Sequence, residues 1–165
     1  MSVTEHRADT PSAICCFLLT ISDTRTADTD ASGDALQALL IARGCTIGGR
    51  RIVRDEPAMV RDLIVEQAGR VDVVITTGGT GLTSRDSTIE AIEGVLQKRI
   101  AGFGELFRML SYQRIGAAAM MSRAAAGTIG RTAVFALPGS IDAVTLAMEE
   151  LIVPEIGHVV RELRR

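Results

Sequence analysis

The stretch that decides the fold runs from Val71 to Glu90 and reads VDVVITTGGTGLTSRDSTIE. Its first residues form a short apolar run rich in Val and Ile, which predicts a β-strand buried on both faces of a parallel sheet. Glycines then occupy three of four positions and break the strand, and they let backbone N–H groups approach an anion closely. Asp86 follows, where it could cap the helix that the spacing of Ile89, Ile92 and Leu96 predicts. The predicted order is buried strand, glycine-rich turn and helix.

This order of elements favours a phosphate- or nucleotide-binding corner. In open α/β sheets, ligands bind at the carboxyl ends of the strands. Here the hydroxyls of Thr77 and Thr80 lie beside the three glycines, which are Gly78, Gly79 and Gly81. The turn is not a P-loop, since no Gly-Lys-Ser/Thr follows, and it lacks the G-x-G-x-x-G spacing of a dinucleotide site. A tight turn without a ligand is the alternative that these residues alone leave open.

Segments that favour strands and helices alternate along the rest of the chain. Apolar runs predict further strands at 14–21, 45–53 and 132–137. Helices are expected at 32–43, 57–69, 91–99, 104–111, 116–121 and 142–160, and residues 100–103 are expected to form an irregular link. Ser140 is expected to cap the last helix and Pro154 to kink it. This alternation predicts a three-layer α/β/α fold with a mostly parallel central sheet.

Length and composition narrow the classes of function. At 165 residues, the chain is long enough for one domain with a substantial core, expected over 13–165 after a disordered polar tail at 1–12. Its net charge of −2 and its 3% aromatic content argue against nucleic acid as a partner. No apolar run approaches the roughly 20 residues that a membrane span needs, and no signal-peptide core is present. The sequence therefore predicts a cytoplasmic protein without a membrane partner.

The thiol and imidazole side chains offer little catalytic chemistry. The cysteines Cys15, Cys16 and Cys45 show no C-x-x-C spacing and are expected to be buried structural thiols. The histidines His6 and His158 lie in the tail and in the last predicted helix. The sequence therefore shows no Ser-His-Asp, Cys-His or zinc-type set.

Polar residues follow four predicted strands at the points where the strands end. They are Ser22 and Asp23, then Asp55 and Glu56, then the turn at 76–81, and finally Pro138, Gly139 and Ser140. Because the carboxyl ends of parallel strands meet at one edge of a sheet, these groups are expected to line a single cleft. Its amides, hydroxyls and carboxylates suit a phosphate ligand that brings Mg²⁺. Ser22 and Asp55 could instead be simple caps of a turn and a helix, because Ser and Asp are preferred there.

Several motifs resemble those of the molybdopterin adenylyltransferase family, the MogA and MoaB proteins. The most specific is Thr-Thr-Gly-Gly-Thr-Gly-x-x-x-Arg-Asp-x-Thr-x-Glu, which spans 76–90. The likeness continues in GFGE at 102–105, SRAAAG at 122–127 and LPGS at 137–140. It covers nearly the whole chain, from Ile14 to Glu162.

The resemblance implies a Mg²⁺-dependent nucleotidyltransferase that adenylylates molybdopterin with ATP and releases pyrophosphate. It implies that Asp55 acts on the metal and in the transfer step, and that Asp86 orients the pterin or the nucleotide. The binding residues that it implies are Ser22, Asp23, Thr77, Gly78, Gly79, Thr80, Gly81, Glu105, Ser122, Pro138, Gly139 and Ser140. It also implies a homo-oligomer, either a trimer or a hexamer, and allows a molybdenum-insertion enzyme as a further partner.

Two competing functions and some local departures stay open. The first alternative is a catalytically weak MoaB-like protein that binds molybdopterin or assembles with other cofactor enzymes, and the second is a CinA-like domain that handles nucleotide pyrophosphates. Ile89 stands where the family usually has proline, so the helix after Asp86 could begin differently. Asp142 is unfavourable near a phosphate unless it faces away or helps to hold the metal. Glu105 and Arg108 are three residues apart, so a surface ion pair is the alternative role for Glu105.

Overall fold

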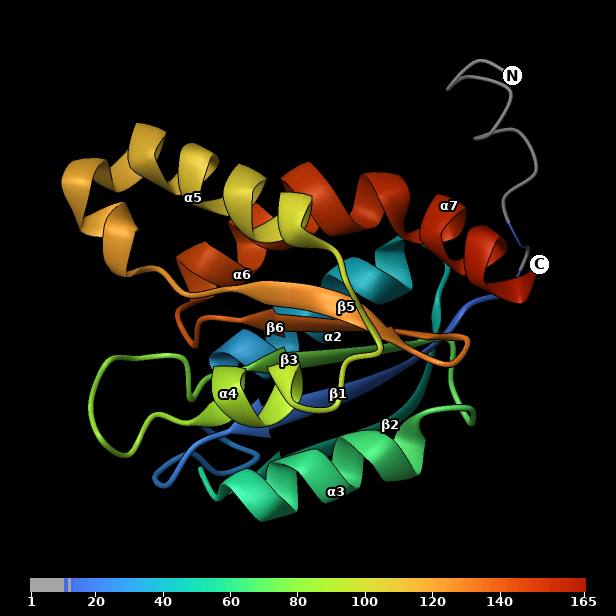
Figure 1. Ribbon diagram of the computed structural model, residues 1–165, viewed down its shortest axis with the longest axis horizontal. Coiled ribbons are helices and arrows are strands. Elements are labelled where there is room, and N and C mark those ends of the chain that lie inside the picture. The colour runs from blue at the N-terminus through green and yellow to red at the C-terminus, as the bar shows by residue number, and fades with distance from the viewer. Residues whose placement is uncertain (1–10, 12) are drawn as a thin grey trace.

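The computed structural model describes residue 11 and residues 13–165. Its centre is a six-stranded sheet in the order β2-β1-β3-β6-β5-β4, shown in Figure 1. Four strands run parallel, and the last two are antiparallel additions at one edge. The strands are β1 (Cys15–Ile21), β2 (Thr46–Val53), β3 (Val73–Thr77), β4 (Lys98–Arg99), β5 (Ala125–Ile129) and β6 (Thr132–Leu137). The expected mostly parallel sheet is confirmed, whereas the tail expected at 1–12 falls almost entirely outside the described residues.

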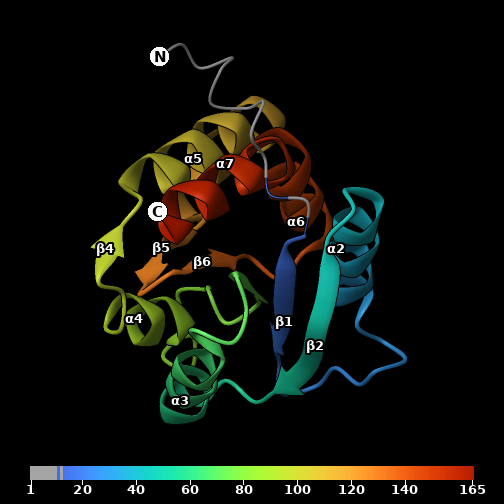
Figure 2. The same cartoon turned by 90° about the vertical axis from the view of Figure 1, so that its right-hand side faces the viewer.

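Helices cover both faces of the sheet, which confirms the three-layer arrangement (Figures 1 and 2). One face packs against α2 (Ala31–Ala42), α5 (Ala101–Ile115), α6 (Ile141–Ala147) and α7 (Val153–Arg164). The opposite face packs against α3 (Pro57–Gln67) and α4 (Thr88–Glu93). The two faces carry separate hydrophobic clusters, with the central strands between them.

The burial of strand β3 explains why apolar and polar residues do not alternate along it. Its five residues are all buried. Val73 and Ile75 belong to the cluster under α2 and α5, whereas Val74 belongs to the cluster over α3 and α4. Because both faces of the strand are covered by helices, an apolar side chain is favoured at every position. The expectation of a strand buried on both faces is confirmed.

The region after the glycine-rich turn differs most from the sequence expectation. Helix α4 ends at Glu93 rather than near residue 99, and Lys98–Arg99 form the short edge strand β4. The alanine-rich segment forms β5, and the link expected at 100–103 is already the first turn of α5. A Cβ atom on Gly127 would lie 2.3 Å from the carbonyl oxygen of Lys98, so the small residue lets β4 pair closely with β5. Such edge pairing depends on a distant partner, which local patterns do not reveal.

The last predicted helix is confirmed in position but not in regularity. Ser140 is its N-cap, as expected, and its Oγ accepts a hydrogen bond from the Ala143 N–H at 3.2 Å. The helix is interrupted by a π-helical segment, Met148–Ile152, before α7 begins at Val153. Pro154 lies in the first turn of α7, where its missing N–H costs little. The segment Gly116–Met121 is helical as expected, in the tighter 3₁₀ form.

Cys16 and Cys45 are buried in the core, as expected, and Cys15 is half-buried. None of the helices in the described part of the chain is long and apolar enough to cross a membrane.

Candidate functional site

The glycine-rich turn after β3 has a backbone shape that requires glycine. Gly78 and Gly79 have φ angles of +96° and +64°, a region that residues with a side chain rarely adopt. A Cβ atom on Gly78 would also lie 2.2 Å from the carbonyl oxygen of Ile21, at the end of the neighbouring strand β1. The turn therefore lies directly against the carboxyl end of β1, and a methyl group at residue 78 has no room.

The turn after β6 packs directly against the glycine-rich turn. A Cβ atom on Gly139 would lie 3.2 Å from the Cα of Gly78, and the Thr77 hydroxyl donates to the Pro138 carbonyl at 3.1 Å. The Gly78 N–H donates to the Leu137 carbonyl at 3.0 Å, which continues the β3–β6 pairing into the turns. Two of the predicted phosphate-binding segments are thus brought together.

Several backbone donors at this edge have no protein partner. The N–H groups of Gly79, Thr80, Gly139 and Ser140 donate to no other group in the described part of the chain. Backbone N–H groups are strong donors, and groups without a protein partner bind water or a ligand. Four such donors on two touching turns form a suitable site for the oxygen atoms of a phosphate.

Asp55 faces the glycine-rich turn and does not cap helix α3. The N-cap residue of α3 is Glu56, which makes no side-chain capping bond. Asp55 Oδ1 instead accepts from the Thr88 hydroxyl at 3.3 Å and from the Ser87 hydroxyl at 3.5 Å. A Cβ atom on Gly79 would lie 2.9 Å from the other carboxylate oxygen, Oδ2. The cap alternative for Asp55 is therefore wrong, and its carboxylate lies beside the turn.

Two further aspartates give this corner a negative character. The Asp55 N–H donates to Asp23 Oδ1 at 3.4 Å, and Asp23 forms an ion pair with the exposed Arg85 at 2.8 Å. Burial raises the pKa of Asp55, and the charges of Asp86 and Asp23 act in the same direction. A cation at this position would relieve the repulsion between the carboxylates.

Asp86 orders its own loop and does not cap α4, so this part of the prediction is wrong. The N-cap residue of α4 is Ser87, again without a side-chain bond. Asp86 Oδ2 accepts from the Thr83 N–H at 3.0 Å and from the Thr83 hydroxyl. The hydrogen bonds from Thr83 hold the pKa of Asp86 below its ordinary value. Whether Asp86 also orients a ligand stays a prediction.

The residue set is compatible with a magnesium ion that a nucleotide brings. In the described part of the chain, no group of three or more His, Cys, Asp or Glu side chains is arranged to hold a metal by itself. Mg²⁺ is usually bound by one or two carboxylates together with substrate phosphates and water. Asp55 and Asp23 supply carboxylates of this kind at the edge where the free N–H groups lie.

Ser22 has a structural role, since its hydroxyl oxygen accepts from the N–H groups of Thr24 and Arg25, at 3.3 Å and 3.1 Å. This is the turn-cap alternative that the sequence left open. A ligand-binding role for Ser22 stays a prediction.

Two charged residues that sequence reasoning did not select join the segments around this edge of the sheet. Asp30 is fully buried, caps α2 and accepts from Arg50 at 2.7 Å. Arg25 donates to the Gly139 carbonyl at 2.8 Å and to the Ser32 hydroxyl, so it joins the turn after β1 to the turn after β6. The one sequence signal was Asp30 itself, because Asp just before a helical pattern is a typical N-cap.

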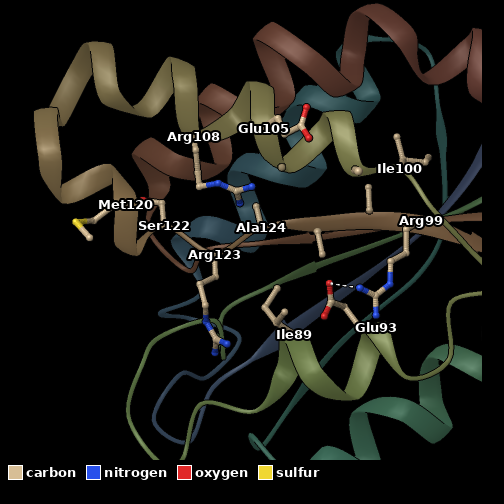
Figure 3. A pocket seen from close by; sticks show the side chains of 14 residues that line it. Ile89, Glu93, Arg99, Ile100, Glu105, Arg108, Met120, Ser122, Arg123 and Ala124 are labelled. Carbon is tan, nitrogen blue, oxygen red and sulfur yellow. Dashed lines mark ion pairs between the residues drawn. The ribbon is translucent and has the colours of Figure 1, made fainter.

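Glu105 and Ser122 lie beside a second region, a pocket of about 400 Å³ between α4, α5 and β5 (Figure 3). In the described part of the chain, no ion pair joins Glu105 to Arg108, although both line this pocket, so that alternative is wrong. Ser122 also lines a smaller pocket of about 190 Å³ with Ser140 and Asp142. Ser122 therefore stands between the turn after β6 and the pocket that holds Glu105.

The structure places the two residues that depart from the family pattern or from the expected site chemistry, Ile89 and Asp142. Ile89 is buried in the cluster beneath the sheet, and α4 begins at Thr88 without proline. Asp142 is exposed in the first turn of α6 and lines the smaller pocket with Ser140.

The chain was compared with known proteins. Residues 17–158 match the family described as the probable molybdopterin binding domain. Molybdenum cofactor biosynthesis protein B from Bacillus anthracis is 52% identical over 168 residues, which covers 100% of this chain and 99% of the relative. A crystal structure of a molybdenum cofactor biosynthesis protein B is 50% identical with a TM-score of 0.91, covering 95% of this chain and 99% of that one. The MoaB from Pyrococcus furiosus, described as a tungsten cofactor synthesizing protein, is 34% identical with a TM-score of 0.82, covering 94% and 99%.

The match spans far more than half of the chain, and the likeness in sequence agrees with the likeness in fold. The resemblance found in the motifs is thereby confirmed. This chain belongs to the probable molybdopterin binding domain family, among the MoaB and MogA proteins of molybdenum cofactor biosynthesis.

Proposed function

We propose that this chain adenylylates molybdopterin with ATP and Mg²⁺ as a step of molybdenum cofactor biosynthesis. The observation that carries the proposal is the contact between the two turns at Gly78 and Gly139, with Asp55 beside them. The turns present N–H groups without protein partners, and Asp55 adds a carboxylate at the same edge. A chain of phosphates with its counter-ion is the ligand that this combination suits best.

The reaction needs little acid–base chemistry from the protein. The terminal phosphate of molybdopterin is already anionic, so it attacks the α-phosphorus of ATP without a strong base, and pyrophosphate leaves. Catalysis then consists of holding the two substrates in line and compensating the charge that they bring together. The N-H groups of Gly79 and Thr80 would bind phosphate oxygens on one side, and those of Gly139 and Ser140 on the other.

Asp55, with Asp23 beside it, would hold the magnesium ion of the nucleotide, which supplies positive charge to the phosphates. The pKa of Asp55 is raised by burial and, to a lesser degree, by the charges of Asp86 and Asp23, and a bound cation would favour its ionised form. Glu105 and Ser122 would contact the pterin in the neighbouring pocket.

The experiment is ATP-dependent pyrophosphate release in the presence of molybdopterin and Mg²⁺. Wild type is compared with Asp55→Ala and with Asp62→Ala, which removes an exposed carboxylate of α3. We expect turnover by the wild type, a loss of at least about tenfold in Asp55→Ala, and no change in Asp62→Ala.

Other outcomes separate the alternatives. Turnover that survives Asp55→Ala would keep the enzyme and remove Asp55 from the mechanism. Tight binding of molybdopterin without turnover would support the MoaB-like binding protein. Release of nucleotide products from a nucleotide pyrophosphate, without any dependence on molybdopterin, would support the CinA-like function.

We also propose that the chain forms a homo-oligomer. Helix α5 exposes a row of apolar side chains at a spacing of three, and the following 3₁₀ helix adds two more; they are Leu106, Met109, Tyr112, Ile115, Met120 and Met121. An apolar face of this kind marks a contact surface in many soluble proteins. Light scattering on the full chain would give the stoichiometry, and a monomeric mass at micromolar concentration would contradict the proposal.

A further inference from the structure

We propose that Arg123 is a positioning residue that fixes the glycine-rich turn in its ligand-binding shape. This inference deepens the proposed function and rests on it where substrate binding is concerned. Arg123 lies 42 residues beyond Gly81, at the start of the segment that leads into β5. It lines the pocket between α4, α5 and β5, and Figure 3 shows its side chain extending toward the loop that precedes α4.

The contacts of Arg123 are almost all with backbone carbonyl groups of the turn. Its Nε donates to the Thr80 carbonyl at 2.9 Å, and its Nη2 donates to the Gly81 carbonyl at 2.6 Å and the Asp86 carbonyl at 3.4 Å. Its Nη1 pairs with Glu90 in α4. The side chain is 24% exposed, so most of the guanidinium lies against the loop.

With these bonds, the three consecutive carbonyl groups of residues 79–81 each accept a hydrogen bond. The Thr88 N–H donates to the Gly79 carbonyl at 3.1 Å, and Arg123 holds the next two. In a trans peptide the C=O and N–H groups point in opposite directions. Each held carbonyl therefore directs the N–H group of the following residue away from the donor that holds it, and the N–H of Gly81 faces Asp86.

Arginine is suited to this task because its planar guanidinium has five donors in a fixed fork. Glycines at 78, 79 and 81 leave the turn backbone with unusual freedom, which raises the entropy cost of ordering it. Arg123 restricts that freedom through hydrogen bonds from a distant part of the chain. Asp86 restricts it from within the loop, where its carboxylate accepts from the Thr83 N–H. A lysine carries its three donors on one nitrogen and lacks the planar fork, so it would hold these carbonyls less firmly.

The test measures hydrogen–deuterium exchange in the full-length protein. The variants are Arg123→Gln, Arg123→Lys and, as a matched control, Arg131→Gln, which removes an exposed arginine from the β5–β6 turn at the far end of the sheet. We expect exchange of the hydrogen-bonded amides of Thr83, Asp86 and Thr88 to accelerate by about tenfold or more in Arg123→Gln, less in Arg123→Lys and not at all in Arg131→Gln. Exchange in β3 is expected to stay unchanged.

Two results would overturn the inference. Unchanged exchange at Thr83, Asp86 and Thr88 would show that Arg123 does not order the turn. Acceleration throughout β3 and β6 as well would show a general structural role instead.

Titration of the same proteins with ATP and Mg²⁺ tests the link to binding. We expect Arg123→Gln to weaken ATP binding by about tenfold, with partial recovery in Arg123→Lys, and to raise KM for ATP more than it lowers kcat. Faster amide exchange in the loop together with a wild-type affinity for ATP would overturn the positioning role. Failure of the wild type to bind ATP would instead reject the proposed function, and the exchange data would still decide whether Arg123 orders the turn.

Discussion

Gly78 and Gly139 are in direct contact, because a Cβ atom added to Gly139 would lie 3.2 Å from the Cα of Gly78. The two residues are 61 positions apart in the sequence, and each follows a central parallel strand. Their contact fixes the distance between the two groups of free N–H donors. The candidate site therefore depends on the packing of two turns that both consist of small residues.

Gly78→Ala tests whether the turn has room for a methyl group at residue 78, and Gly130→Ala is its control. Both glycines have positive φ, +96° and +57°, so both substitutions carry backbone strain of at least about 1 kcal/mol. Only at Gly78 would the methyl group also meet the Ile21 carbonyl. We expect Gly130→Ala to lower the free energy of unfolding by about 1 kcal/mol and Gly78→Ala to lower it clearly more, measured by urea denaturation. Equal losses would contradict the close approach.

Asp55→Asn tests the electrostatic cost of the candidate metal site. Because the pKa of Asp55 is raised in the folded protein, the folded state favours its neutral form. The contribution of Asp55 to stability is then complete below the unfolded pKa and is lost as the pH rises through the folded pKa. We expect Asp55→Asn to raise Tm at pH 7 without Mg²⁺, and the gain to vanish below pH about 4. A lower Tm at pH 7, with Asp62→Asn unchanged, would contradict this sign.

Asp30→Asn tests the buried ion pair that holds the start of α2. Burial by itself would raise the pKa of Asp30, but hydrogen bonds from Arg50 and two other donors outweigh it and lower the pKa. Its stabilisation is therefore present above the unfolded pKa and is lost as the pH falls through the folded pKa. We expect Asp30→Asn to reduce the free energy of unfolding at pH 7 by about 1–3 kcal/mol, and by less near pH 3.

Asp34→Asn is the matched control, because Asp34 is exposed and pairs with the same arginine, Arg50, at 2.6 Å. We expect it to cost less than about 1 kcal/mol in the same denaturation experiment. Similar losses for Asp30→Asn and Asp34→Asn would mean that burial adds nothing to the ion pair.

Arg25→Gln tests the connection between the turns after β1 and β6. Arg25 donates to the Gly139 carbonyl at 2.8 Å, so its loss frees the turn that carries two of the proposed phosphate donors. We expect ATP affinity, measured by titration calorimetry, to fall by about three- to tenfold, which corresponds to roughly 1 kcal/mol. Arg61→Gln, in an exposed pair on α3, is the control. Equal affinity in wild type and Arg25→Gln would reject the connection.

The four parallel strands and their polar ends could be predicted from local sequence alone. The run before Gly78 is apolar at every position because helices cover both faces of β3, and glycine stands where the backbone needs positive φ. Ser140 caps the last helix through a bond three residues away, which is also a local feature. Such signals are visible because their physical cause lies within a few residues of the signal itself.

Only the tertiary structure decided which residues hold these pieces together. No local pattern gives Arg25 or Arg123 a holding role, because the carbonyl groups that they bind lie 114 positions away for Arg25 and 37, 42 and 43 positions away for Arg123. The same holds for β5, which needs β4 and β6 beside it. The sequence by itself determined the family and the central strands. The arrangement of charges around the candidate site followed only from long-range packing, whose partners no local pattern specifies.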